Sequence, residues 1–200
     1  MRRLWIFARK LSSVEHNESV RITVRPNVYI YLVLLLFLIP IQWLFAWILA
    51  LSVHEFCHWA AVKACGGKVF ELTIGIGGVQ MQSTPLPNRR RLFCILSGPL
   101  GGFLLVFLGR WFSRIALCSW ILSLYNLLPF SFLDGGKGLE ILIGNNITEI
   151  IGKILLILLS VAAVYAAFVF DLGILPLAVI TGLWLKNRNT PCKPHICRLQ

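Results

Sequence analysis

The stretch LSVHEFCHWA, residues 51–60, places His54, Glu55 and His58 inside a long apolar run. The two histidines are four residues apart, so on a helix they share one face and their imidazoles can reach one metal ion at about 2.0–2.1 Å. Glu55 follows the first histidine, where it can act as general base in a His-Glu-x-x-His zinc site. The alternative interpretation is that the pattern occurs by chance, or that these polar residues hold membrane helices together. A charge at the centre of a bilayer costs about 2.5–3.5 kcal/mol, which favours the metal site.

The composition is that of a small membrane protein. Of 200 residues, 58% are hydrophobic and only 14% charged, with a mean hydropathy of +0.79. Soluble domains are nearer half apolar and a quarter charged. The net charge of +11 would suggest nucleic acid in a soluble protein. No stacking platform or basic helix supports such a partner, so we expect a protein of the lipid bilayer that binds no nucleic acid.

The apolar runs predict an all-α polytopic membrane protein with about six transmembrane helices. Residues 28–64 are too long for one span of roughly 20 residues, and a turn is expected at Pro40–Gln42. The last predicted span is short and interrupted by Pro176. The six predicted spans are residues 28–40, 43–64, 92–109, 114–129, 149–170 and 172–185.

The distribution of basic residues predicts the orientation. Six spans place both termini on one side, and every Lys and Arg except Arg110 and Arg114 falls on that side. The positive-inside rule makes it the cytoplasmic side. The expected organisation is a basic interfacial segment at 1–27 with a short surface helix, a membrane domain at 28–185, and a basic cytoplasmic tail at 186–200.

Residues 69–82, VFELTIGIGGVQMQ, change from helical to strand periodicity. Apolar side chains alternate with polar ones or glycine on either side of Gly77–Gly78. This pattern predicts a β-hairpin between the second and third helices. A lone hairpin is marginally stable, so we expect it to pack on the membrane domain.

Asp134 is the best candidate for a third metal ligand. It follows an apolar stretch and precedes Gly135–Gly136, which permit a tight turn and a close approach of backbone. In the six-span topology it emerges on the cytoplasmic side, where His54 and His58 also lie, so the three side chains can meet. The alternative is a simple Asp-Gly turn. The other acidic residues weighed belong to the hairpin, to helix starts or to the outer loop: Glu71, Glu140, Glu149 and Asp171.

Three segments together resemble the site-2 proteases, a family of intramembrane zinc metalloproteases. HEFCH at 54–58 matches the family's metal-binding helix, and NLLPFSFLDGGK at 126–137 resembles its second motif. SGPLGG at 97–102 resembles the small-residue motif of the next helix, although close helix packing alone explains it. The resemblance covers about residues 25–145, a catalytic core of about 28–145. It is strongest to the sporulation type, stage IV sporulation protein FB, which has six spans and a hairpin-like segment.

The resemblance implies a metalloendopeptidase with one Zn²⁺ per chain. His54, His58 and Asp134 would hold the ion, Glu55 would be the base, and Asn126 would bind substrate or the oxyanion. For Asn126 an interhelical hydrogen bond is the alternative. The implied substrate is a membrane-tethered protein, such as a pro-sigma factor, cleaved in a bacterial cell membrane by regulated intramembrane proteolysis. The hairpin would hold an unwound substrate strand by β-addition, or merely cover the mouth of the site.

A rival interpretation is a non-enzymatic metal-binding membrane scaffold or metal transporter. Transport favours ligands strung along a path, whereas this chain has one compact set with Glu55 beside it. A partner that regulates the chain within the membrane is left open.

Four features depart from the family pattern or lie outside it. Phe132 stands where the sporulation type commonly has proline, so the loop before Asp134 is expected to be less rigid. Cys57 stands where the family often has glycine, as a bystander or a soft extra ligand. The nucleotide-sensing C-terminal domain of the sporulation type is expected to be absent. In the tail, Cys192, His195 and Cys197 form an incomplete set with irregular spacing, and no metal is expected there.

Overall fold

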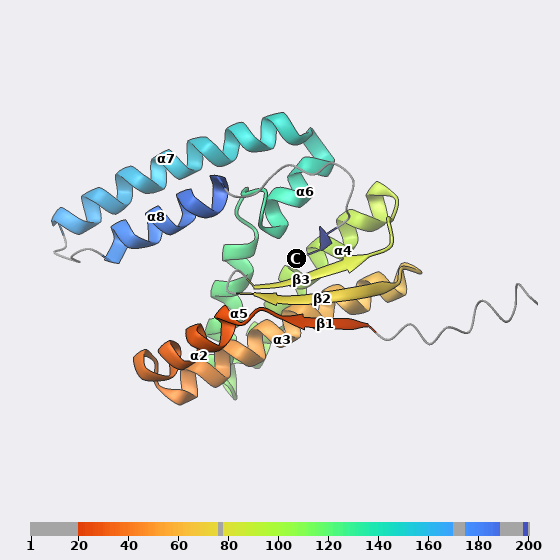
Figure 1. Ribbon diagram of the computed structural model, residues 1–200, viewed down its shortest axis with the longest axis horizontal. Coiled ribbons are helices and arrows are strands. Elements are labelled where there is room, and N and C mark those ends of the chain that lie inside the picture. Colours follow the sequence, from red (N-terminus) through yellow and green to blue (C-terminus); the bar gives the residue numbers. More distant parts are fainter. Residues whose placement is uncertain (1–19, 76–77, 170–174, 189–197, 200) are drawn as a thin grey trace, which may run out of the picture.

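The structure, a computed structural model, describes residues 20–75, 78–169, 175–188 and 198–199. Within those residues the chain is mostly helical, with one small sheet (Figure 1). The helices are α2 (Asn27–Leu38), α3 (Ile41–Ala64), α4 (Asn88–Val106), which runs into the 3-10 turn η1 (Phe107–Arg110), α5 (Ser113–Asn126), α6 (Asp134–Ile143), α7 (Asn145–Val169) and α8 (Leu175–Arg188).

Proline and glycine set the helix boundaries around the site. Ile39 is extended, as expected of a residue before proline, so α2 ends and α3 begins after Pro40. Beyond α3, Gly66 has a φ of +78°, which lets the chain turn from the helix into the sheet. Gly144, with a φ of +88°, separates α6 from α7 in the same way. A break between two helices is thus present at Pro40, as predicted, but Gln42 belongs to the first turn of α3 and not to the connection.

The sheet contains the predicted hairpin and two further strands. β2 (Val69–Gly75) and β3 (Gly78–Ser83) pair antiparallel, with Leu72 opposite Met81. β1 (Arg21–Val24) pairs with β2 in parallel, and β4 (Arg198–Leu199) pairs antiparallel with β3 at Gln82 and Met81. The strand order is β1-β2-β3-β4. The hairpin is therefore not alone, because flanking strands share its backbone hydrogen bonds.

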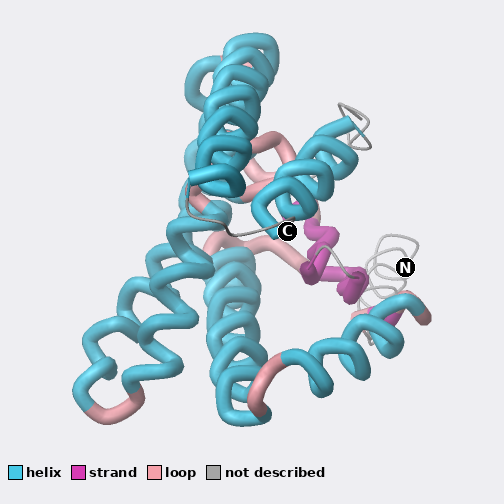
Figure 2. The backbone as a smooth tube through the Cα atoms, turned by 90° about the vertical axis from the view of Figure 1, so that its left-hand side faces the viewer, coloured by secondary structure: helices cyan, strands magenta, loops and turns pink. Residues whose placement is uncertain are grey.

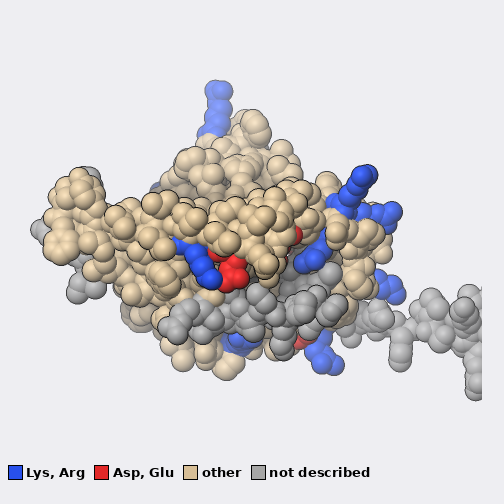
Figure 3. Space-filling view, turned by 90° about the horizontal axis from the view of Figure 1, so that it is seen from above, with Lys and Arg blue, Asp and Glu red and all other residues tan. Residues whose placement is uncertain are grey.

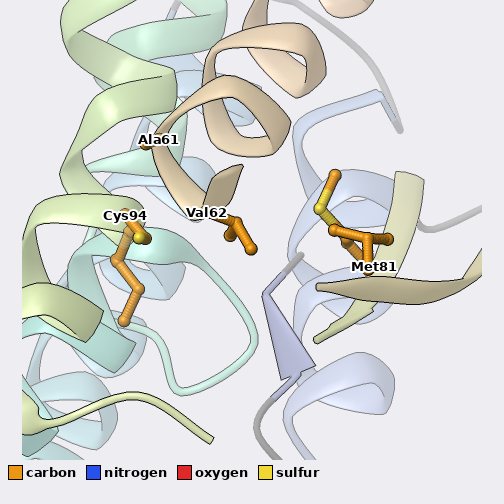
Figure 4. Packing of buried hydrophobic residues seen from close by; sticks show 6 residues of the cluster. Ala61, Val62, Met81 and Cys94 are labelled. Carbon is orange, nitrogen blue, oxygen red and sulfur yellow. The ribbon is translucent and has the colours of Figure 1, made fainter. Parts of the chain in front are cut away.

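The sheet packs on the ends of α3 and α4, as predicted for the hairpin. Val69 and Met81 are buried against Ala61 and Val62 of α3, and Cys94 of α4 belongs to the same cluster. In Figure 4, Val62 lies between Cys94 on the helical side and Met81 on the sheet. Val62 thus separates the sheet from the turn of α4 that carries Cys94.

The helices divide into two groups. α3, α4 and α5 pack against one another, and α6 connects this group to α7 and α8. Figures 1 and 2 both show α7 and α8 side by side, at the opposite end of the molecule from α2. The centre of the molecule is therefore where α3, α4, α5 and α6 meet.

Among the residues that the structure describes, two helices are long and apolar enough to cross a membrane. They are α3, with 24 residues, and α7, with 25. Much of the apolar surface faces outward; Phe168 of α7, for example, is 83% exposed. Figure 3 shows a face on which charged side chains gather toward one end and at one place in the middle. Apolar exposure on this scale indicates a lipid environment.

The other predicted spans are helices but are not confirmed as spans. α2 has 12 residues, about 18 Å at 1.5 Å per residue, which is shorter than a hydrocarbon core of about 30 Å. α5 and α8 have 14 residues each, and α4 carries three arginines in its first turn. Six spans therefore remain a prediction.

The structure corrects three boundaries. Residues 21–24, assigned to a basic interfacial segment, form β1, because the pattern Ile-Thr-Val suits a strand beside β2. Pro176 does not interrupt α8; it lies in the first turn, where the missing N–H has no helical partner to lose. α8 also continues to Arg188, so Lys186 belongs to a helix and not to the tail.

The predicted surface helix near residues 4–7 and the set Cys192, His195 and Cys197 lie outside the described residues.

Candidate metal centre

α3 presents both histidines to the interior. The side chains of His54 and His58 are buried, and their rings meet edge to face with centroids 4.8 Å apart. They lie one helical turn apart, so the helix alone brings their Nε2 atoms to 3.2 Å. This confirms that the two imidazoles share one face, as their spacing predicts.

Asp134 reaches the histidines from the start of α6. Its Oδ2 lies 3.2 Å from Nε2 of His54 and 3.1 Å from Nε2 of His58, and its side chain is 2% exposed. Among the described residues, these three form a group whose ligand atoms all lie within 4.8 Å of one another. The structure therefore brings together the three predicted ligands.

The spacing of these atoms fits a metal ion. Two ligand atoms held 2.0–2.1 Å from a tetrahedral Zn²⁺ are about 3.3–3.4 Å apart, close to the observed 3.1–3.2 Å. The backbone of α4 leaves the space between them open at Gly98. A Cβ atom on Gly98 would overlap Nε2 of His58 and lie 2.8 Å from Nε2 of His54. Gly98 is thus the floor of the candidate metal site.

α4 also fixes the orientation of His58. The Nδ1–H of His58 donates a hydrogen bond of 2.7 Å to the carbonyl oxygen of Cys94. A histidine that donates from one ring nitrogen keeps the lone pair of the other for a metal. The hydroxyl of Ser97 donates to the carbonyl oxygens of Cys57 and Cys94, which ties α3 to α4 at the same level.

Glu55 and Lys137 place further charge beside the three ligands. The Glu55 carboxylate interacts electrostatically with His58, Asp134 and Lys137, and its Oε2 is buried with no hydrogen-bond partner among the described residues. Burial lowers the pKa of the Lys137 ammonium to about 8, although the carboxylates of Asp134, Glu55 and Glu140 oppose that shift. A buried, unpaired carboxylate oxygen is suited to accept a proton from a water molecule.

Two glycines allow α6 to approach this site. A Cβ atom on Gly135 would overlap the carbonyl group of Leu127, at the end of α5. A Cβ atom on Gly136 would overlap the carbonyl group of Phe130. Both contacts are with backbone, which cannot move aside cheaply. The glycines that follow Asp134 therefore permit a close approach of backbone, as predicted. Asp134 and both glycines belong to the first turn of α6, so this segment is not a simple Asp-Gly turn.

Comparison with solved structures supports this interpretation of the geometry. The chain has the fold of a site-2 protease. It superposes on the site-2 protease from Methanocaldococcus jannaschii with a TM-score of 0.60, at 20% sequence identity, over 86% of this chain and 93% of that one. No protein-family model and no curated protein sequence matches it. At 20% identity the likeness concerns the fold, and the chemistry depends on the side chains of the site.

The remaining candidate residues, Asn126 and Cys57, are not among the ligands of this centre. Asn126 is the last residue of α5, and its Nδ2 donates to the carbonyl oxygen of Leu122 in the same helix, not to another helix. Its role toward a substrate stays a prediction. The thiol of Cys57 packs against Gly101 of α4, which favours the bystander interpretation.

Sequence reasoning missed the role of Gly98. The SGPLGG motif was explained by helix packing, and Gly101 and Gly102 do have that role, against Cys57 and Ser123. Gly98 instead contacts the ligand atoms themselves. Nothing in the local pattern distinguishes it, because the difference depends on how α4 aligns with α3.

Proposed function

We propose that the chain is a site-2 protease, an intramembrane zinc metalloprotease that hydrolyses a peptide bond in or near the membrane segment of a tethered protein. The observation that carries the proposal is the convergence of His54, His58 and Asp134, with the Glu55 carboxylate beside them. Both histidines and Glu55 belong to a helix long and apolar enough to cross a membrane. The fold shared with a site-2 protease supports the same assignment.

His54, His58 and Asp134 would hold one Zn²⁺. Bound there, zinc would polarise the substrate carbonyl and lower the pKa of a water molecule to about 7. Glu55 would accept a proton from the attacking water molecule while the oxygen of that water forms a bond to the carbonyl carbon. Glu55 then gives the proton to the departing amine nitrogen as the C–N bond breaks. Because Gly98 has no side chain, the space beside the ligand atoms stays open. The carbonyl oxygen of Cys94 holds the His58 ring in place.

We propose that the substrate reaches the site as an extended strand. A transmembrane helix satisfies its own backbone hydrogen bonds, so it must unwind before a peptide bond can react. The hairpin is the candidate receptor by β-addition. Within the described residues β1 pairs with β2, and β4 pairs with β3 at Gln82 and Met81. The edge of β3 at Gly78–Gln80 is where a substrate strand would add.

The finer assignments rest on the motifs of the sporulation type. We propose a bacterial cell membrane, six spans, cytoplasmic termini and a membrane-tethered pro-sigma factor as the first substrate to test. Regulation by a membrane partner belongs to the same proposal. The charges of the first turns of α7, where Lys153 and Glu149 form an ion pair of 2.7 Å, suit the membrane surface.

The Glu55→Gln variant tests the proposal. Glutamine keeps the size of the side chain but cannot take the proton, so cleavage of a tethered pro-sigma-type substrate should fall by about 10²–10⁴-fold. The zinc content should stay at one ion per chain, because Glu55 is not a ligand. Glu149→Gln, an equivalent change at an exposed site of α7, is the control and should cleave like the wild type.

The outcomes separate the candidate functions. Equal cleavage by Glu55→Gln and the wild type would reject Glu55 as the base. Zinc binding without cleavage of any tethered substrate would favour the metal-binding scaffold. Transport of zinc across vesicles by the wild type would favour the transporter.

A further inference from the structure

The loop that delivers Asp134 is packed from behind by the last helices. This ligand loop, residues 127–133, joins α5 to α6. Its side chains Phe130, Phe132 and Leu133 are buried in one cluster with Leu156 of α7. Leu183 of α8 packs against the same cluster. The position of Asp134 therefore depends on α7 and α8, although neither helix supplies a ligand.

The aromatic rings of the ligand loop are ordered by a contact from α8. Phe130 and Phe132 stack with centroids 5.5 Å apart and an interplanar angle of 3°. The Nζ atom of Lys186 lies over the Phe132 ring, 4.4 Å from its centroid. A cation at that distance is attracted by the face of the ring, more strongly where water is excluded. Phe132 is buried and Lys186 is partly buried, so water has little access to the contact between them.

α8 is itself held in register with α7. The Nε1–H of Trp184 donates a hydrogen bond of 3.1 Å to the hydroxyl of Ser160, and that hydroxyl donates to the carbonyl oxygen of Leu156. Leu156 is the residue of α7 that joins the loop cluster. Lys186 and Leu156 thus approach the ligand loop from two helices that are tied to each other.

Backbone hydrogen bonds connect the aromatic residues of the loop to Asp134. Phe132 is two residues before the ligand, and the N–H of Leu133 donates to the carbonyl oxygen of Phe130. The N–H of Lys137 then donates to the carbonyl oxygen of Leu133, which anchors the first turn of α6. Displacement of Phe132 from its packed position would therefore move this backbone, and with it the Oδ2 atom that faces the histidines.

We propose that Lys186 is a positioning residue: its ammonium, over the Phe132 ring, latches the ligand loop and holds Asp134 in place as the third ligand. The ligand role of Asp134 rests on the proposed function, whereas the latch itself is a property of the loop. The latch makes the C-terminal helix a determinant of metal retention.

Lys186→Met and Lys186→Arg test the latch in the full-length protein. Methionine keeps the apolar stem but removes the charge, whereas arginine keeps a cation for the ring. Partners that orient a ligand from outside typically change metal affinity by 10–100-fold, so loss of zinc to a chelator should be about tenfold faster in Lys186→Met. Lys186→Arg should be close to the wild type. Lys153→Met, at an exposed position of α7, is the matched control and should change nothing.

Hydrogen exchange supplies a readout that needs no metal. In zinc-free protein, amides of residues 127–137 should exchange faster in Lys186→Met and in Phe132→Leu, and at the wild-type rate in Lys186→Arg. The effects of Lys186→Met and Phe132→Leu on the exchange rates should not be additive in the double variant, because both changes remove the same contact. Unchanged exchange in Lys186→Met, or additive effects, would overturn the latch. Faster exchange in a protein whose wild type binds no zinc would uphold the latch and reject the proposed function.

Discussion

Replacing Gly98 by alanine is expected to abolish metal binding, and with it all cleavage, while the helices remain folded. The added Cβ would overlap Nε2 of His58 and lie 2.8 Å from Nε2 of His54. It would thus take the space between the two ligand atoms that an ion needs. Alanine favours a helix over glycine by about 0.5–1 kcal/mol, which offsets part of the cost of the clash. Zinc content per chain and thermal unfolding of the purified protein measure the two effects separately.

Gly101→Ala is the matched control for Gly98→Ala. It adds the same methyl group one turn later in α4, where it would overlap the thiol of Cys57. The clash with α3 is similar, but no ligand atom is involved. Gly101→Ala should therefore unfold at a lower temperature and still bind one zinc ion. Cys57→Ala should restore part of its stability, because it removes the thiol but keeps the Cβ atom of residue 57, 2.9 Å from the new methyl group. Gly98→Ala with wild-type zinc affinity would show that the ion does not lie between His54 and His58.

The part of the site that lies within one helix was predictable from sequence. His54 and His58 needed only a helical repeat to converge, and the apolar run and Pro40 bounded that helix. The hairpin was equally local, since its alternation and glycines lie within residues 69–83. Local periodicity specified these elements because their stabilising contacts are close in sequence.

The contacts between distant segments were harder to predict. Asp134 was selected by topology and resemblance. Its distances to the histidines depend on how α6 packs on α4 and on the backbone of Leu127 and Phe130, which follow α5. The strand β1 was assigned to a surface segment because its partner β2 lies about fifty residues away. Lys186 was assigned to the tail because a charged residue after an apolar run usually marks the end of a membrane span. Its contact with Phe132 exists only once α8 has folded back along α7.

Replacing Gly135 by alanine is expected to displace Asp134 and to destabilise the protein. The new Cβ would overlap the carbonyl group of Leu127, so the first turn of α6 must move away from the end of α5. Overpacking of this kind costs about 1–3 kcal/mol and more where backbone must shift. Because Asp134 is the neighbouring residue, zinc affinity should fall sharply together with the unfolding temperature. Zinc titration and thermal unfolding of the same preparation measure both.

Gly138→Ala provides the contrast within the same helix. A Cβ atom there would meet Leu92 at 3.5 Å and Ile95 and Leu96 at 4.0 Å, which are ordinary packing distances. The gain in helix propensity should then leave the variant as stable as the wild type or slightly more stable, with zinc fully bound. If Gly135→Ala behaved like Gly138→Ala, α6 would not approach α5 through Gly135, and the position of Asp134 would need another explanation. If both lost zinc, any change in α6 would disturb the site, and the effect could not be assigned to the contact with Leu127.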